Sequence, residues 1–222
     1  MITIPVTDKK VKSESSVAPG FISITDVIPD AILEIRYYSE FNFVGSRIDS
    51  YEAPLAFLTE EASLALKKAS DDLAEQGYRI KIYDAYRPQT AVDHFKRWAE
   101  DLDDTKMKPF FYPDVEKSEM ISKGYIAERS SHSRGSTVDL TIVDTLTGEE
   151  VDMGSAFDFF GEISHAEQTY GLTEVQIENR RILRRAMNKN GFKVLPQEWW
   201  HFTLENEPYP DTYFDFPITF KS

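Results

Sequence analysis

The residues best suited to chemistry in this chain are its histidines, because cysteine is absent. Without cysteine the chain cannot form a disulfide, a thiolate metal site or a cysteine nucleophile. A transition metal bound here must therefore use histidine and carboxylate ligands. The four histidines are His94, His132, His165 and His201.

His132 and Asp139 lie on either side of a predicted turn. Both belong to the segment SSHSRGSTVD, which covers residues 130–139. The Arg-Gly pair in this segment lets the chain turn, and Asp139 then lies on the strand predicted over 137–143. A ligand on the loop and a ligand on the following strand could converge on one ion, although this spacing is loose when judged alone.

Glu198 and His201 form a second pair, in the sequence Glu-Trp-Trp-His. In a plain strand their side chains would point to opposite faces, so both reach one site only if a turn or bulge precedes the strand. Two histidines and one carboxylate leave the fourth position of a zinc ion open to water, as a hydrolytic metal requires. A second carboxylate that is not a ligand can take the water's proton, and Glu198 is the candidate for this general base.

Arg87 lies in the sequence Tyr-Asp-Ala-Tyr-Arg-Pro, where a predicted strand ends and a helix follows. A fixed guanidinium at a strand end could stabilise an oxyanion. Ordinary interpretations exist for these residues as well. Arg87 could form a structural ion pair with Asp84, His201 could be a core histidine beside two tryptophans, and Glu198 could be a solvated surface charge. Spacing alone leaves both interpretations open.

Helices and strands are predicted around these residues from caps and periodicity. Thr59 is a capping residue, Thr173 and Gln176 form a capping box, and an apolar helical stripe runs from Ala91 to Leu102. The predicted helices lie within 59–77, 91–102 and 173–191, and the predicted strands cover 78–83, 137–143 and 199–204. Because these elements do not alternate regularly, we expect an α+β fold with a central, mainly antiparallel sheet flanked by helices.

The 222 residues suffice for one domain, which we place at 21–222 after a polar lead-in over 1–20. With 25 basic and 38 acidic side chains the net charge is −13, which argues against nucleic-acid binding. No apolar run approaches the roughly 20 residues needed to span a bilayer, and the first 20 residues lack a signal-peptide core. We therefore expect a cytoplasmic protein, with an exported mature form as the alternative.

Several longer motifs occur in a fixed order along the chain. The strongest are SSHSRGSTVDLT over 130–141 and EWWHFTLENEPYPDTYFDFP over 198–217. The others are IRYYSEFNFVG (35–45), YDAYRP (83–88), AVDHF (91–95), EMISKGYIAERSS (119–131), MGSAFDFF (153–160) and NRRILRRAM (179–187). This set, from about residue 21 to the end, closely resembles the VanX-type D-alanyl-D-alanine dipeptidases, zinc enzymes of the wider D-Ala-D-Ala carboxypeptidase family.

The resemblance implies a zinc site formed by His132, Asp139 and His201. It implies Glu198 as the base that removes a proton from water, and Arg87 as the group that stabilises the tetrahedral intermediate. Zinc would polarise the scissile carbonyl of the substrate and lower the pKa of the metal-bound water that attacks it.

The resemblance also implies a small dipeptide substrate, D-Ala-D-Ala, which is hydrolysed to two D-alanines. Asp158 and Tyr37 are expected near the free ammonium of this substrate, and Ser130 in substrate binding. The alternatives are a DD-carboxypeptidase acting on peptidoglycan stem peptides and a metal-binding module without catalysis. The biological role, vancomycin resistance or recovery of D-alanine from wall turnover, stays open, as does the oligomeric state.

Overall fold

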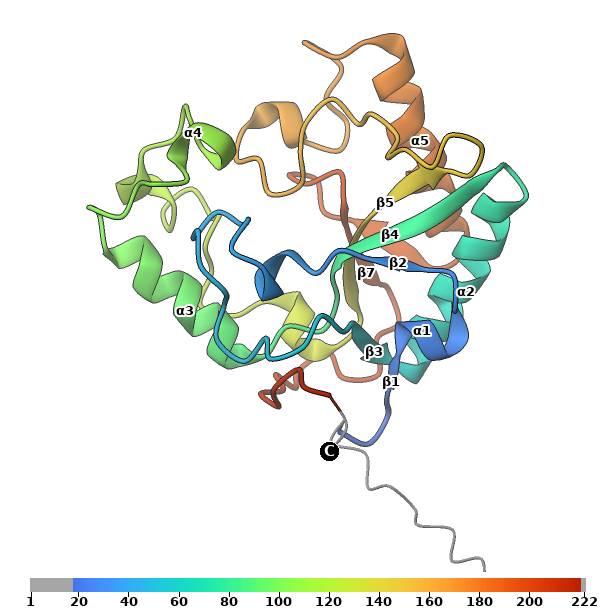
Figure 1. Cartoon of the computed structure of the whole chain (residues 1–222), viewed down its shortest axis with the longest axis horizontal. Coiled ribbons are helices and arrows are strands. Elements are labelled where there is room, and N and C mark those ends of the chain that lie inside the picture. Colours follow the sequence, from blue (N-terminus) through green and yellow to red (C-terminus); the bar gives the residue numbers. More distant parts are fainter. Residues whose placement is uncertain (1–17, 221–222) are drawn as a thin grey trace, which may run out of the picture.

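Five strands form the main sheet of the molecule (Figure 1). Their order across the sheet is β2-β4-β5-β7-β6, with β2 parallel to β4 and all other neighbours antiparallel. The strands are β2 (Ile32–Leu33), β4 (Tyr78–Asp84), β5 (Thr137–Asp144), β6 (Phe192–Val194) and β7 (His201–Leu204). The predicted α+β fold with a mainly antiparallel sheet is therefore confirmed.

This computed structural model describes residues 18–220, so most of the lead-in predicted over 1–20 lies outside the described residues. Within 18–220, no helix combines the length and the apolar character that crossing a membrane requires.

Helices flank the sheet, as predicted. α2 (Glu60–Ala74) and α5 (Glu174–Lys189) contact each other, and they contact β4 and β6 respectively. α3 (Gln89–Glu100) and α4 (Lys108–Phe111) lie on the opposite side of the molecule in Figure 1. The short elements are α1 (Ile24–Val27), an antiparallel pair of strands β1 (Phe21–Ser23) and β3 (Phe57–Thr59), and the 3₁₀ helices η1 (Arg36–Tyr38), η2 (Lys117–Glu119), η3 (Ser131–Arg134) and η4 (Glu162–Ser164).

Short-range capping fixes where α2 and α5 begin. The Thr59 hydroxyl accepts a hydrogen bond from the Ala62 N–H at the start of α2 (3.4 Å). At the start of α5, Thr173 and Gln176 satisfy each other's backbone N–H groups, which is the predicted capping box. Both helices therefore begin where the sequence placed them.

The helical stripe predicted from Ala91 to Leu102 is wrong at its end. α3 ends at Glu100, and the Leu102 side chain is exposed. The reason is local, because the Asp101 carboxylate accepts a hydrogen bond from the Asp103 N–H (3.2 Å) and forms a turn that competes with further helix.

The polar side of β5 is buried as well as its apolar side. Residues 137–143 are all buried, and the hydroxyls of Thr137 and Thr203 lie 2.9 Å apart. An aromatic cluster covers the region between the sheet and α3, where Phe43 contacts Phe95, Trp98 and Phe160 with ring centroids 4.8–5.2 Å apart. Thr137, Asp139 and Thr141 are themselves buried, so these polar side chains of β5 are shielded from bulk water.

Candidate active site

Three ionisable residues lie in one row across neighbouring strands. Asp139 on β5 pairs with His201 on β7, and Asp84 on β4 pairs with Asp139. The second pairing arises because the β4–β5 register shifts between Ile82 and Asp84. A regular register would place Tyr83 opposite Asp139. The bulge thus adds a carboxylate to the row, which the sequence did not predict.

A turn precedes β7 and brings Glu198 to the same side as His201. The Glu198 N–H donates to the Leu195 carbonyl (3.1 Å), and the His201 N–H lies 3.4 Å from the Glu198 carbonyl. β7 consequently begins at His201 rather than at Trp199, where the strand was predicted to start. The turn that the sequence required is present, and a Glu198 oxygen lies 3.4 Å from His201 Nδ1.

His132 reaches the row from η3, the 3₁₀ helix before β5. Its Nδ1 lies 2.7 Å from the Ala85 carbonyl oxygen, which can only accept, so Nδ1 carries the proton. Nε2 is then unprotonated and faces Asp139, at 3.3 Å from a carboxylate oxygen. The ring is 1% exposed, so its orientation is fixed by burial and by this hydrogen bond.

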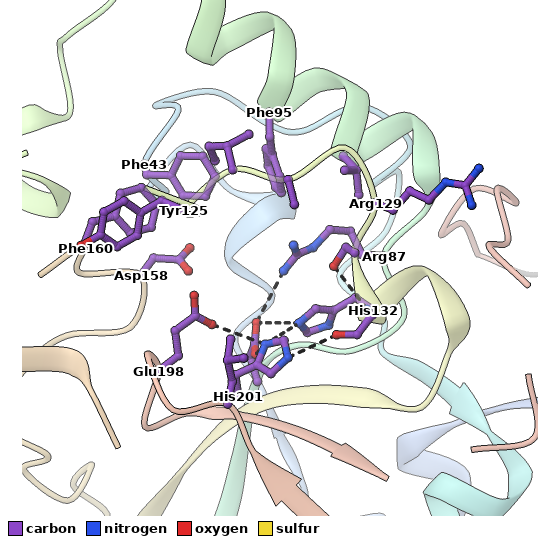
Figure 2. Close-up of a pocket in the computed structure, with 18 of the residues that line it drawn as sticks. Phe43, Arg87, Phe95, Tyr125, Arg129, His132, Asp158, Phe160, Glu198 and His201 are labelled. Atoms are coloured by element: carbon purple, nitrogen blue, oxygen red, sulfur yellow. Dashed lines mark hydrogen bonds and ion pairs between the residues drawn. The ribbon is translucent and has the colours of Figure 1, made fainter. Parts of the chain in front are cut away.

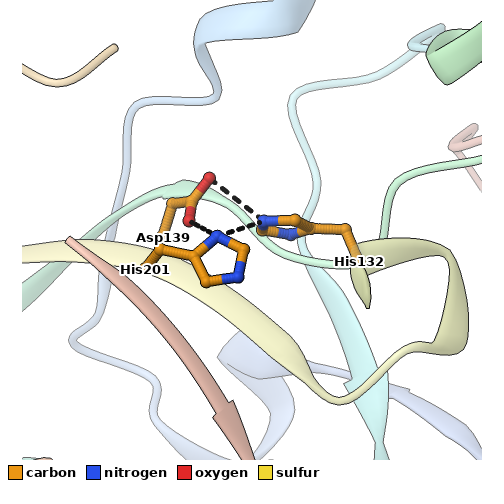
Figure 3. Close-up of side chains that lie close together, drawn as sticks. All are labelled: His132, Asp139 and His201. Atoms are coloured by element: carbon orange, nitrogen blue, oxygen red, sulfur yellow. Dashed lines mark hydrogen bonds and ion pairs between the residues drawn. The ribbon is translucent and has the colours of Figure 1, made fainter. Parts of the chain in front are cut away.

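His132, Asp139 and His201 converge in a compact cluster (Figure 3). One ligand atom from each residue lies within 4.8 Å of the others. His132 Nε2 is 3.2 Å from His201 Nδ1, and His201 Nδ1 is 3.1 Å from Asp139 Oδ1. Asp139 Oδ1 is nevertheless buried without a hydrogen bond. This set of two nitrogens and a carboxylate can hold a metal ion.

The buried surroundings shift the pKa values of all three residues in this cluster. Burial raises the pKa of Asp139, but the interactions with the neighbouring His132 and His201 rings outweigh it and hold this pKa well below its usual range. Burial lowers the pKa of His201, but the nearby carboxylates of Asp139 and Glu198 raise it overall. Burial dominates at His132 and lowers its pKa. Asp139 is therefore ionised across the neutral range.

Glu198 is a carboxylate with an altered acidity. Its side chain is 25% exposed and lines the same cavity as the cluster. Burial raises its pKa, the positive charge of His201 lowers it, and the negative charge of Asp139 raises it, with a net rise. A carboxylate with a raised pKa is a stronger base than a free glutamate, so the environment favours proton uptake here.

Arg87 points into this cavity and is held from behind by Asp84 (Figure 2). Its Nε donates to an Asp84 oxygen at 2.9 Å, and the other Asp84 oxygen accepts from the Tyr51 hydroxyl at 2.6 Å. The guanidinium lies 4.9 Å from the centre of the Tyr37 ring, and one terminal nitrogen is 3.5 Å from Asp139. Arg87 thus forms the ion pair with Asp84 and also lies in the cavity.

Tyr37 and Asp158 meet at the other end of the cavity, although 121 residues separate them. The Tyr37 hydroxyl donates to the Asp158 carboxylate at 2.9 Å. Asp158 is buried with φ of +60°, a left-handed conformation that non-glycine residues seldom adopt. Burial, reinforced by the charges of Asp139 and Glu198, raises the pKa of Asp158 well above its usual range.

The cavity that these groups line has a volume of about 300 Å³, at the small end for ligand sites. Ser130 also lines it, and the Ser130 hydroxyl accepts from the His132 N–H (3.3 Å) at the start of η3. All eight site residues proposed from the sequence lie along this cavity: Tyr37, Arg87, Ser130, His132, Asp139, Asp158, Glu198 and His201.

Sequence reasoning missed the residues that orient these groups. Asp84 and Tyr51 fix Arg87, and the Ser131 hydroxyl lies 3.2 Å from His201 Nε2. The position of Asp84 could have been noticed, because it lies three residues before Arg87 in the same motif. That spacing predicts an ion pair but not a role in orienting Arg87. Tyr51 gave no such signal, because its contact with Asp84 spans 33 residues.

The remaining two histidines lie outside the cluster. His94 accepts a hydrogen bond from the Asp49 N–H (3.1 Å), and its ring also lies 3.2 Å from the Asp49 carboxylate. His165 lines a neighbouring cavity and does not reach the ligand atoms.

Comparison with known proteins agrees with this arrangement. A sequence profile of the D-Ala-D-Ala dipeptidase family matches residues 17–219. The chain is 43% identical over 200 residues to a D-alanyl-D-alanine dipeptidase of Enterococcus faecalis, covering 90% of this chain and 98% of the relative. Dipeptidases of the same name from Enterococcus faecium and Streptomyces coelicolor are 42% and 39% identical, covering 90% and 89% of this chain and 98% of each relative. The chain therefore belongs to the D-Ala-D-Ala dipeptidase family of metallopeptidases.

Proposed function

We propose that the domain over 21–222 hydrolyses the dipeptide D-Ala-D-Ala to two D-alanines with the help of a zinc ion. The observation that carries this proposal is the convergence of three ligand atoms, a basic carboxylate and a fixed arginine on one cavity of about 300 Å³. The names of the relatives at 39–43% identity support the substrate.

His132, Asp139 and His201 fit a zinc ion. Zinc bonds of about 2.0–2.1 Å in a tetrahedron place neighbouring ligand atoms about 3.3–3.5 Å apart. The two nitrogens here lie 3.2 Å apart, close to that spacing. His132 Nε2 lies 3.3 Å from Asp139 Oδ2 and His201 Nδ1 lies 3.1 Å from Asp139 Oδ1, so either carboxylate oxygen is near the site. A buried carboxylate oxygen without a hydrogen bond, Asp139 Oδ1, is the further sign of a missing electrophilic partner. When bound, zinc supplies Lewis-acid chemistry that polarises a carbonyl and acidifies water.

Glu198 and Arg87 carry the steps that the chain itself performs. Glu198 takes a proton from the attacking water, so that a C–O bond forms at the scissile carbonyl carbon. The same proton then passes from Glu198 to the departing nitrogen as the C–N bond breaks, which leaves the second D-alanine as a free amine. The guanidinium of Arg87 lies beside Asp139 and offers positive charge to the developing oxyanion.

Asp158 and Tyr37 account for the preference for a dipeptide. The substrate of a dipeptidase has a free ammonium, and the Asp158 carboxylate with its Tyr37 hydrogen bond is a suitable counter-ion. A longer peptide has an uncharged amide at that position, which leaves a buried carboxylate without its cation. Ser130 lines the cavity near His132, where its hydroxyl can bind a polar group of the substrate.

The substitution Glu198→Ala tests this proposal. We expect zinc binding, measured by metal analysis, to stay near one ion per chain while turnover of D-Ala-D-Ala falls at least ~100-fold, the range for loss of a general base. Glu205→Ala is the matched control, because Glu205 is an exposed glutamate at the far end of β7. Wild-type turnover by Glu198→Ala would refute the base assignment. Comparable turnover of N-acetyl-D-Ala-D-Ala by the wild type would refute the dipeptide preference.

A further inference from the structure

A second cavity of about 630 Å³ adjoins the catalytic one. The two cavities share four lining residues, Gly124, Tyr125, Leu195 and Glu198. The catalytic cavity therefore does not end in solid protein on this side. These shared residues lie between it and a larger space that the proposed dipeptidase reaction does not use.

Tyr125 supplies the largest side chain of this partition. Its ring stacks on Phe160, with centroids 5.0 Å apart and an interplanar angle of 19°. Its N–H donates to the Met120 carbonyl at 3.0 Å, which fixes the backbone at this position. Phe160 is buried, so it provides a rigid support for the ring. The position of the tyrosine ring is thus determined by packing and by the main chain together.

The charges around Tyr125 come from both cavities. Burial raises the pKa of its hydroxyl, Lys123 lowers it, and Glu162 and Glu198 both raise it. Glu162 lines only the second cavity, whereas Glu198 lines both. The tyrosine side chain is therefore close to the carboxylate of the catalytic site and to a carboxylate of the second cavity.

The partition lies at the amino end of the proposed substrate. In Figure 2, Tyr125 and Phe160 lie at the same end of the pocket as Asp158 and Glu198, and Arg129 lies at the opposite end. If the substrate ammonium faces Asp158, a residue added before it must extend past the tyrosine ring. The second cavity has room for such a residue, and its Glu162 carboxylate can accept the displaced ammonium.

We propose that Tyr125 determines substrate length, by closing the passage from the catalytic cavity to the second cavity against peptides extended at the amino end. This inference rests on the proposed dipeptidase function. The class of ligand that the second cavity would take is the amino-terminal residue of a tripeptide ending in D-Ala-D-Ala. Asp158 selects dipeptides over longer peptides by the charge of their ammonium, and Tyr125 excludes longer peptides by volume.

The experiment compares hydrolysis of L-Ala-D-Ala-D-Ala with hydrolysis of D-Ala-D-Ala. We expect Tyr125→Ala to raise the tripeptide-to-dipeptide ratio of kcat/KM about tenfold or more, the size of effect that a changed pocket volume produces. Tyr125→Leu should raise it less, and Tyr125→Phe, which keeps the ring, should leave the tripeptide excluded. Tyr170→Ala is the control, because it removes a tyrosine that is 89% exposed and lines neither cavity.

Binding provides a second measurement that does not depend on turnover. In a Glu198→Gln background, calorimetry should show tighter tripeptide binding when Tyr125 is also replaced by alanine. An unchanged ratio and unchanged binding in folded Tyr125→Ala and Tyr125→Leu would overturn the inference, and so would efficient tripeptide hydrolysis by the wild type. If the wild type fails to hydrolyse D-Ala-D-Ala, the proposed function is wrong, whereas the binding comparison still decides whether Tyr125 closes the passage.

Discussion

Gly135 connects the two segments that carry His132 and Asp139, and replacing it with alanine tests how the site is assembled. Its φ of +82° places it in the left-handed region, where glycine is preferred. A Cβ atom added there would lie 2.2 Å from the Phe21 ring and 3.2 Å from the Thr59 methyl group. The substitution therefore introduces both backbone strain and a steric clash.

The size of the effect follows from these two causes. The left-handed conformation costs a non-glycine residue roughly 1–2 kcal/mol. Overpacking costs about 1–3 kcal/mol more, because the Phe21 ring is itself wedged against Tyr86, Phe214 and Phe216 with centroids 4.9–5.2 Å away. We therefore expect Gly135→Ala to lower the free energy of unfolding by about 2–5 kcal/mol.

Gly148→Ala is the matched control, because Gly148 has φ of +72° and no atom within 4 Å of an added Cβ. It should lose only the backbone contribution, about 1–2 kcal/mol in urea unfolding. Zinc affinity should fall in Gly135→Ala alone, because the clash displaces the segment that carries His132. Equal stability losses in the two variants would refute the packing argument. An unchanged zinc affinity in Gly135→Ala would refute the coupling to the site.

Two further predictions concern buried carboxylates. Asp84→Asn removes the charge that holds Arg87, so we expect kcat to fall about 100-fold with a smaller change in KM. Asp211→Asn, at an exposed aspartate, is the control and should have no effect. A normal kcat in Asp84→Asn would contradict this positioning role. The pKa of Asp158 is raised in the native state, so the folded protein keeps a proton there that the unfolded chain releases above about pH 4. The free energy of unfolding of the wild type therefore falls as the pH rises from about 4 toward the native pKa. In metal-free protein, Asp158→Asn should therefore gain stability relative to the wild type between pH 5 and about pH 8. Urea midpoints that differ by a constant amount across this range would contradict the assignment.

The elements predicted correctly from the sequence are those whose signals are local. The capping box at Thr173 and the cap at Thr59 involve residues within one helical turn, so the sequence contains the whole interaction. β1, β2, β3 and β6 were not predicted, because strands of two or three residues show no clear periodicity. Leu102 illustrates the opposite error, in which periodicity suggested a helix that a local turn at Asp101 had ended.

The site shows the same division between local and long-range information. Residue types and spacing made a site of His132, Asp139 and His201 plausible, and the family resemblance selected these three residues. Their convergence depends on the register that pairs Asp139 with His201, and no sequence pattern specifies a register between strands 62 residues apart. The position of Asp84 in the same row depends on a bulge, which the alternation over 78–83 conceals.

The balance of charge around the cavity gives a reason for the metal that is independent of the ligand geometry. Four carboxylates, those of Asp84, Asp139, Asp158 and Glu198, gather around the guanidinium of Arg87. The negative charge of Asp139 helps to raise the pKa of both Asp158 and Glu198, so the carboxylates repel one another. A divalent cation bound by Asp139 and the two histidines would offset that repulsion and lower both pKa values. Lower pKa values would favour the ionised form of Glu198, which a general base needs, and the ionised form of Asp158, which can pair with an ammonium. If Asp139 binds the metal and Asp158 binds the substrate as proposed, the two events would be coupled through the charge of Asp139.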